Sequence, residues 1–177
     1  MSKAFTRESD DSSDEPIPPR PSSTLPPGAK NYLTPDGAAR LRSELHRLEN
    51  EERPSIAAGS EPEDERKRRL QRIDQRIQQL EDALRSAVVT PPPSGARERN
   101  QVQFGATVTV RRKDGEVTYR IVGVDEADPD RLWVSWPSPI ARALMQKRLG
   151  ERVRFTFPSG EEELEVVKIA YEDAAGV

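Results

Sequence analysis

Apolar residues recur at helical spacing in a first stretch that follows a clear helix start. Thr34 suits the cap position of a helix, and Pro35 suits the first helical position, where its missing N–H costs nothing. Pro54 lies well inside the same stretch, where a proline must kink or end a helix. We therefore predict a helix from about residue 35 that is disturbed near residue 54. Its apolar positions, four and three residues apart, are Leu41, Leu45 and Leu48.

A second stretch repeats the pattern more regularly, with steps of three, four, three and four residues. Its apolar positions are Leu70, Ile73, Ile77, Leu80 and Leu84. Ser60 or Glu61 can cap this helix and Pro62 can take its first position. So narrow a stripe is typical of pairing with one other helix. A short turn near residues 57–61 joins the two stretches, which predicts an antiparallel helical hairpin.

Beyond residue 101 the apolar period changes to two, which predicts strands. The strand positions are Val108 and Val110; Val117, Tyr119 and Ile121; Leu132, Val134 and Trp136; Val153, Phe155 and Phe157; and Leu164, Val166 and Ile169, the last set with one irregular step. Lys113-Asp114-Gly115 and Ser159-Gly160 are turn signals between strands. Residues 140–149 have helical spacing and end at Gly150.

These patterns predict an α+β protein in four segments: a tail, a hairpin, a linker and a small domain. Residues 1–31 are rich in Ser, Asp, Glu and Pro and are expected to be disordered. Residues 32–90 form the helical hairpin, and residues 91–101, with three consecutive prolines, form the linker. Residues 102–173 are expected to form an antiparallel sheet with one short helix.

The composition excludes several kinds of functional site but does not identify one. The chain is 33% hydrophobic and 33% charged with a net charge of −3, so no global charge argues for nucleic acid. It has no cysteine and one histidine, His46, which excludes thiolate or His-pair metal sites and most Ser/His triads. Acidic residues near the N-terminus, where a signal peptide needs apolar ones, predict a cytoplasmic protein.

Five short motifs stand out along the chain: Asn-Tyr-Leu-Thr-Pro-Asp-Gly at residues 31–37, Glu-Arg-Pro at 52–54, Leu-Gln-Arg-Ile-Asp-Gln-Arg at 70–76, Tyr-Arg-Ile-Val-Gly-Val-Asp-Glu at 119–126 and Ser-Pro-Ile-Ala-Arg-Ala-Leu at 138–144. In these motifs the chain resembles the Gre transcript-cleavage factors, and the GreB branch of that family more closely than GreA. The resemblance covers residues 31–172 apart from the tip of the hairpin.

The resemblance implies an FKBP-like C-terminal domain that grips bacterial RNA polymerase at the rim of its secondary channel. It also implies a coiled-coil finger that brings acidic tip residues to the magnesium ion of the polymerase and approaches the 3′ end of the nascent RNA. The factor would have no cofactor of its own, would be a monomer away from membranes, and would be accessory to the polymerase rather than an enzyme. Carboxylates at such a site hold a second Mg²⁺ and position water for attack on a phosphodiester.

The tip of the hairpin departs from the family. The family motif of type Gly-Asp-x-x-Glu-Asn is absent, and only 15 residues, 55–69, separate the second motif from the third. That is roughly a dozen fewer than in the family, which shortens each arm by ~9 Å at ~1.5 Å per residue. The remaining acidic tip residues, Glu61, Glu63, Asp64 and Glu65, are either surrogate catalytic ligands or simply suited to the dipole of a helix N-terminus.

A second departure lies beside the short helix, where the family usually has an acidic residue at the polymerase contact. This chain has Pro137 there, followed by the family residues Ser138, Pro139 and Arg142. All four are candidate polymerase-binding residues. Capping and packing of the helix is the structural alternative, and the two roles are compatible.

Two further groups of residues are candidate contacts. A basic stripe on the second helix, formed by Arg66, Arg69, Arg72 and Arg76, either faces nucleic acid or is a solvated flank paired with acidic residues such as Glu44 or Glu51. Trp133 and Trp136 are three residues apart, so in a strand they would point to opposite faces, one into the core and the other outward as an exposed contact.

Four functional hypotheses follow. The chain is a transcript-cleavage factor, or a non-cleaving competitor in the secondary channel that inhibits transcription. A peptidyl-prolyl isomerase is a remote alternative that rests only on the FKBP-like resemblance, and a coiled-coil adaptor unrelated to transcription is the last.

Overall fold

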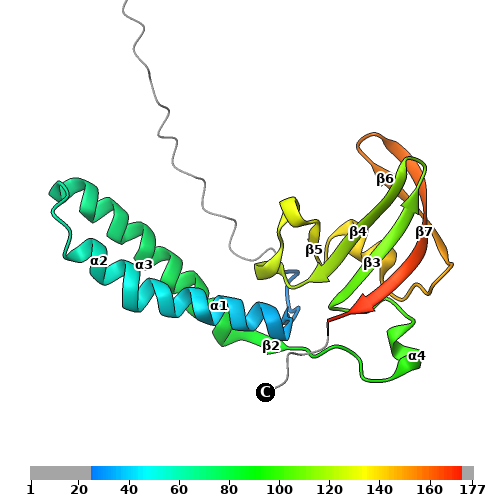
Figure 1. Cartoon of the computed structure of the whole chain (residues 1–177), viewed down its shortest axis with the longest axis horizontal. Helices are drawn as coiled ribbons and strands as arrows, with labels where there is room; N and C mark the ends of the chain where they lie inside the picture. Colours follow the sequence, from blue (N-terminus) through cyan, green and yellow to red (C-terminus); the bar gives the residue numbers. More distant parts are fainter. Residues whose placement is uncertain (1–24, 173–177) are drawn as a thin grey trace, which may run out of the picture.

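The computed structural model describes residues 25–172, which form a helical hairpin that projects from a small domain built on a curled sheet (Figure 1). The α+β fold class is thereby confirmed. The predicted tail lies outside the described residues except for its last few positions. In the described part of the chain, no helix is both long and apolar enough to span a membrane.

The first arm of the hairpin is continuous through Pro54. Helix α1 (Pro35–Arg47) passes into a π-helix, η1 (Leu48–Glu52), and then into α2 (Arg53–Ala57). Within the wider turn the N–H of Arg53 donates to the carbonyl of Leu48. Proline clashes with the carbonyl four residues earlier and cannot donate to it. The π-turn accommodates this loss, so the arm neither ends nor needs a sharp kink at Pro54.

The second arm is the single helix α3 (Glu63–Ser86), which runs back antiparallel to the first. Pro62 occupies the cap position, and no side chain caps the helix. The prediction of a cap at Ser60 or Glu61 is therefore wrong by one or two residues. The predicted seam residues pack together, except for Leu70, which lies outside the cluster. The buried cluster is Leu33, Ala38, Leu41, Leu48 and Leu80, with Leu45, Ile73, Ile77 and Leu84 partly buried against it.

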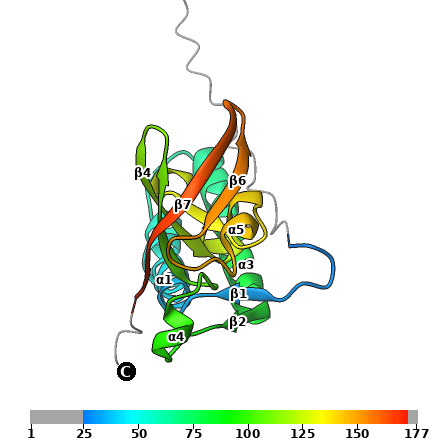
Figure 2. The same ribbon diagram turned by 90° about the vertical axis from the view of Figure 1, so that its right-hand side faces the viewer.

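Two short strands close the base of the hairpin. β1 (Asn31–Leu33) pairs in parallel with β2 (Ala87–Val89), so the chain enters and leaves the hairpin side by side (Figures 1 and 2). Each strand has three residues, too few for an alternating pattern to be read from sequence. The pairing places the start of α1 beside the end of α3.

The C-terminal sheet has the order β5-β4-β3-β7-β6. All its pairs are antiparallel except β4 with β5, so the predicted all-antiparallel sheet needs correction. Between β4 and β5 the chain turns back twice, at the 3-10 turns η2 (Val124–Glu126) and η3 (Pro129–Arg131). Because it turns twice, β5 runs in the same direction as β4. The strands are β3 (Ala106–Arg112), β4 (Gly115–Val122), β5 (Trp133–Ser135), β6 (Arg152–Phe157) and β7 (Gly160–Tyr171).

The irregular step predicted in the last strand is a shift of register against β3. Thr109 pairs with Lys168, whereas the next residue, Val110, pairs with Val166. The extra residue at this bulge lets Ile169 pack on the same core-facing side of the sheet as Leu164 and Val166. Leu132, expected in the third strand, lies outside β5 in a left-handed conformation with φ of 56° and is exposed.

The short helix α5 (Pro139–Leu144) buries Ala141 and Leu144 against the sheet. It ends about one turn earlier than predicted, because the next residues pair with a different segment. The N–H of Val102 donates to the carbonyl of Lys147 at 2.7 Å, and the N–H of Gln146 donates to the carbonyl of Val102 at 2.8 Å. These bonds replace helical ones, and Gln146 adopts a positive φ of 68°. The expected linker 91–101 contains one further short helix, α4 (Ala96–Arg99).

Candidate functional site

The tip of the hairpin is a tight turn tied to α3 by two arginines. The N–H of Gly59 donates to the carbonyl of Ile56 at 3.1 Å. Arg66 donates to the carbonyl of Gly59 at 3.3 Å, and the guanidinium of Arg69 pairs with the carboxylate of Glu61. Of the predicted tip acids, Glu61 is therefore already engaged by a cation within the same chain.

The other three tip acids, Glu63, Asp64 and Glu65, occupy the exposed first turn of α3. This placement suits the positive end of the helix dipole. Among residues 25–172, no three His, Asp or Glu side chains are grouped so that they could hold a metal ion.

The arginine stripe takes part in holding the two arms together. Arg76 makes two bonds to Glu44 on α1, from Nε to Oε1 at 2.8 Å and from Nη2 to Oε2 at 3.0 Å. This is one of the ion pairs that the solvated-flank interpretation anticipates. Arg72 is exposed on the same helix. A role for the stripe in binding nucleic acid stays a prediction, and Arg72 is its most accessible member.

A second ion pair between the arms lies closer to the tip. The Nε of Arg53 donates to Asp74 Oδ1 at 2.6 Å, from α2 to α3. The hydrogen bond and the negative charge of Asp74 raise the pKa of Arg53. The two arms of the finger are thus held together by an ion pair near the tip, between Arg53 and Asp74, and by a second one midway, between Arg76 and Glu44.

The four candidate docking residues gather at the start of α5. The Oγ of Ser138 accepts from the N–H of Ala141 at 3.4 Å, and Pro139 is the first helical residue. Nε of Arg142 donates to the carbonyl of Pro137 at 2.9 Å, which folds the arginine back over the turn. The capping role is therefore present, while Pro139 and Arg142 are also exposed to a partner.

The two tryptophans are both half-buried, so neither is the exposed contact that the sequence suggested. Trp133 has three guanidinium groups around its ring, those of Arg40, Arg120 and Arg131, at 4.5, 4.7 and 5.2 Å from the centroid. Trp136 follows β5 and meets the ring of Tyr32 edge-on at 5.8 Å. Both rings therefore contact the segment that carries the finger.

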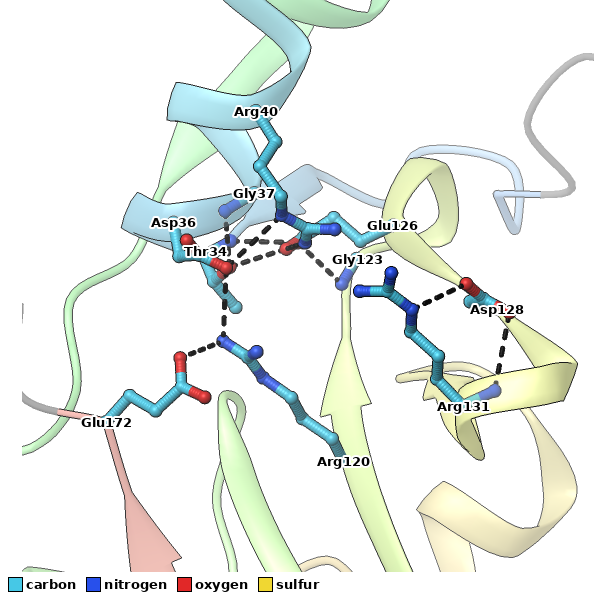
Figure 3. A network of polar contacts seen from close by, with 10 residues as sticks. All are labelled: Thr34, Asp36, Gly37, Arg40, Arg120, Gly123, Glu126, Asp128, Arg131 and Glu172. Atoms are coloured by element: carbon cyan, nitrogen blue, oxygen red, sulfur yellow. Dashed lines mark hydrogen bonds and ion pairs between the residues drawn. The ribbon is translucent and has the colours of Figure 1, made fainter.

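The finger meets the C-terminal domain in a polar joint centred on Glu126 (Figure 3). Its Oε2 accepts from the backbone N–H of Thr34 at 2.9 Å and from that of Gly123 at 3.0 Å. Its Oε1 accepts from the hydroxyl of Thr34 at 2.5 Å. The same hydroxyl accepts from the N–H of Gly37 at 2.9 Å and so caps α1.

The sequence does not predict this joint. It predicts Thr34 only as a helix cap, although Thr34 and Glu126 both lie in motifs that carry the family resemblance. One signal was available: Gly37 lies in the first turn of a helix, where glycine is unfavourable unless something approaches closely. Nothing in the sequence identified Glu126 as the group that approaches.

Comparison with known proteins gives consistent matches along the chain. Residues 97–171 match the family model for the C-terminal part of the transcription elongation factors GreA and GreB. Transcription elongation factor GreB of Neisseria meningitidis serogroup B is 44% identical over 156 residues, covering 80% of this chain and 94% of that protein. Transcription elongation factor GreA of Halorhodospira halophila is 40% identical over 158 residues, covering 81% of this chain and 99% of that protein.

The alignment with the Neisseria protein also bears on the length of this chain. It runs over 156 positions but includes 80% of 177 residues, about 142, so about 14 aligned positions have no residue here. Among solved structures, GreA factor homolog 1 of Thermus thermophilus is 25% identical, covering 80% of this chain and 99% of that one, with a TM-score of 0.37.

Proposed function

The chain belongs to the GreA/GreB family of transcription elongation factors, and on that premise we propose that it binds bacterial RNA polymerase at the secondary channel and modulates the cleavage of backtracked RNA. In this proposal the C-terminal domain docks on the rim of the channel and the helical hairpin enters it. The observation that carries the proposal is the combination of a projecting, ion-paired finger with a preserved docking motif at α5.

Docking is supported by the surface at the start of α5. Ser138 and Pro139 fix the first turn, and Arg142 is held against the carbonyl of Pro137. A residue that is both positioned and exposed loses little conformational entropy on binding. Replacing the usual acidic residue by Pro137 removes one charge from this surface, so the affinity for polymerase is expected to differ from that of GreB.

The finger supports insertion into a narrow channel. It is only two helices wide, and α3, with 24 residues, has a length of ~36 Å at ~1.5 Å per residue. Mg²⁺ demands ligands at ~2.0–2.1 Å. A finger shortened by ~9 Å in each arm cannot reach the same ion by changing side-chain rotamers.

A second candidate function follows from that shortening. The chain keeps the docking surface and could occupy the channel without assisting cleavage, as a competitor of an ordinary Gre factor. The engagement of Glu61 by Arg69 favours this alternative, because one of the tip carboxylates is already neutralised.

The deciding experiment uses stalled, backtracked elongation complexes with 3′-labelled RNA, incubated with this protein and Mg²⁺. The test variant replaces Glu61, Glu63, Asp64 and Glu65 together by their amides. The matched control replaces Glu49 and Glu51, exposed acids elsewhere on the same finger. Release of short 3′ fragments that the test variant loses and the control keeps would establish cleavage by the short finger.

If no fragments appear but the protein blocks cleavage by an ordinary Gre factor, the competitor function holds instead. Docking is tested separately by polymerase affinity. Arg142→Ala is expected to weaken binding several-fold, whereas Arg154→Ala, an exposed arginine on β6, leaves it unchanged. Absence of any binding to polymerase would refute both functions and favour the adaptor hypothesis.

A further inference from the structure

The N-terminus of the finger is bonded to the C-terminal domain through one buried carboxylate. The side chain of Glu126 is 1% exposed, yet it belongs to η2 of the C-terminal domain while its main partner, Thr34, starts α1. Thr34 is itself 4% exposed. Three hydrogen bonds reach this carboxylate: two come from Thr34, 92 residues away in the chain, and one comes from the neighbouring Gly123.

This arrangement is stabilised by charge as well as by hydrogen bonds. A buried carboxylate needs several donors or a cation to offset its desolvation. Glu126 accepts two backbone N–H groups and a hydroxyl, and the guanidinium of Arg40 on α1 lies 3.6 Å from Oε1. The carboxylate also faces the first turn of α1, where the helix dipole is positive. Losing the carboxylate would therefore leave buried donors on both sides of the joint.

The two glycines beside Glu126 show how closely the parts approach. A Cβ added to Gly37 would lie 1.8 Å from Glu126 Oε1, and a Cβ added to Gly123 would lie 2.1 Å from the carbonyl oxygen of Tyr32. Neither glycine has a positive φ, so the residue type is required by space rather than by backbone conformation. The contact leaves no room for the finger to tilt without breaking these bonds.

Other contacts surround the carboxylate without duplicating it. Nδ2 of Asn31 donates to Asp125 Oδ2 at 3.0 Å, and Tyr32 packs against Phe104 and Trp136 with ring centroids 5.7 and 5.8 Å apart. These contacts hold β1 beside the domain. The Glu126 contact is the buried one that bonds the cap residue of α1, from which the whole first arm extends (Figure 3). Asp36 in the same turn also pairs with Arg120 at 3.7 Å, but its side chain is half exposed.

We propose that Glu126 is a positioning residue that sets the direction of the finger relative to the docking surface. This inference rests on the proposed function, because direction matters only if the finger must enter a channel while the domain is docked. Because the finger is several helical turns long, a small change of angle at its base produces a large displacement at its tip. Glu126 would thus govern activity without touching polymerase or RNA.

The test measures the geometry directly, without polymerase. The chain has no cysteine, so Ser60→Cys at the fingertip and Ser159→Cys at the β6–β7 turn give two unique spin-label sites at exposed positions. Pulsed electron paramagnetic resonance of the full chain is expected to give one narrow distance distribution. In Glu126→Ala the distribution is expected to broaden or gain a second peak, because the remaining contacts of this part of α1, Asp36 with Arg120 and Arg40 with Trp133, involve half-exposed side chains.

The control is Glu161→Gln, an exposed glutamate at the far end of the sheet, which is expected to keep the narrow distribution. Glu126→Gln keeps the side-chain volume and an oxygen for the two N–H groups, so it is expected to rescue the narrow peak. If Glu126→Ala does not fold, Gly37→Ala displaces the same carboxylate from the helix side and replaces it in the test. A Glu126→Ala distribution identical to wild type, or a control that broadens equally, overturns the proposal.

The functional readout separates positioning from docking. In Glu126→Ala, affinity for polymerase is expected to stay close to wild type because the surface at α5 is untouched. The effect on transcript cleavage, whether stimulation or competition, is expected to fall by about 10-fold or more. Equal loss of affinity and effect contradicts the proposal. If wild type does not bind polymerase at all, the proposed function fails, while the distance measurement still decides whether Glu126 orients the finger.

Discussion

Replacing Gly37 by alanine tests the joint with a single methyl group. In an ordinary helix this change is stabilising, because alanine has a higher helix propensity than glycine by ~1 kcal/mol. Here the added Cβ would lie 1.8 Å from Oε1, 2.1 Å from Cδ and 2.7 Å from Cγ of Glu126. The methyl group and the carboxylate cannot occupy the same space, so Glu126 must move.

The size of the effect follows from the bonds that Glu126 loses when it moves. Hydrogen bonds to a charged group each contribute ~1.5–3 kcal/mol net, and Glu126 accepts three. Partial hydration of the opened joint recovers some of that loss, which leaves a cost of about 3–5 kcal/mol. After the gain in helix propensity, the free energy of unfolding is expected to fall by about 2–4 kcal/mol.

A double-mutant cycle assigns this loss to the contact itself. In a Glu126→Ala background the three atoms nearest the new methyl group are gone, so Gly37→Ala should become neutral or stabilising. Urea unfolding followed by far-UV circular dichroism measures each free energy, and thermal unfolding should shift by about 2–4 °C per kcal/mol. If Gly37→Ala destabilises both backgrounds equally, or stabilises the wild type, the joint does not hold as described.

Three further outcomes are expected. Thr34→Ala removes both the helix cap and a bond to Glu126 and should cost about 2–4 kcal/mol in urea unfolding, whereas Thr34→Ser should cost less than about 1; similar costs would contradict the shared hydroxyl. A double-mutant cycle on Glu44 and Arg76 should give a coupling of only about 0.5–1 kcal/mol that weakens with salt, because both side chains are about one-third exposed; a coupling above 2 would show that the pair is more buried than it is here. Tyr171→Phe should cost about 1–2 kcal/mol, because the hydroxyl donates to the carbonyl of Gln101 at 2.6 Å and accepts from the N–H of Gln103 at 3.0 Å. Burial raises the pKa of Tyr171 above its ordinary value, so its contribution is fully present below about pH 10 and is lost as the pH rises through the folded pKa; unfolding measured from pH 8 to 11 should show that loss in wild type and not in the phenylalanine variant.

The pattern of apolar residues along the sequence was sufficient to predict the helices and strands in which buried positions recur at a regular spacing. The seam from Ile73 to Leu84 and the alternation around Val108, Tyr119 and Leu164 each indicate one-sided burial over several residues. The structure buries those faces wholly or in part. The cap at Thr34 and the proline start of α5 were also predictable, because capping involves only neighbouring residues.

Tertiary contacts decided the features that leave no local pattern. The end of α5 at Leu144 depends on pairing with residue 102, and the direction of β5 depends on two turns that precede it. The π-turn before Pro54 depends on the arm continuing along α3, since the sequence alone allowed an end or a kink.

The candidate site divides in the same way. The tip acids, the arginine stripe and the docking residues could be named from sequence, since each is a short run with its own chemistry. Their partners could not, because Glu61 with Arg69 and Arg76 with Glu44 depend on how the arms fold together. The joint at Glu126 shows this most clearly. Its carboxylate becomes a buried acceptor only because Thr34, 92 residues away in the chain, brings its donors within 3 Å. Such a contact between distant residues produces no periodic pattern in the sequence.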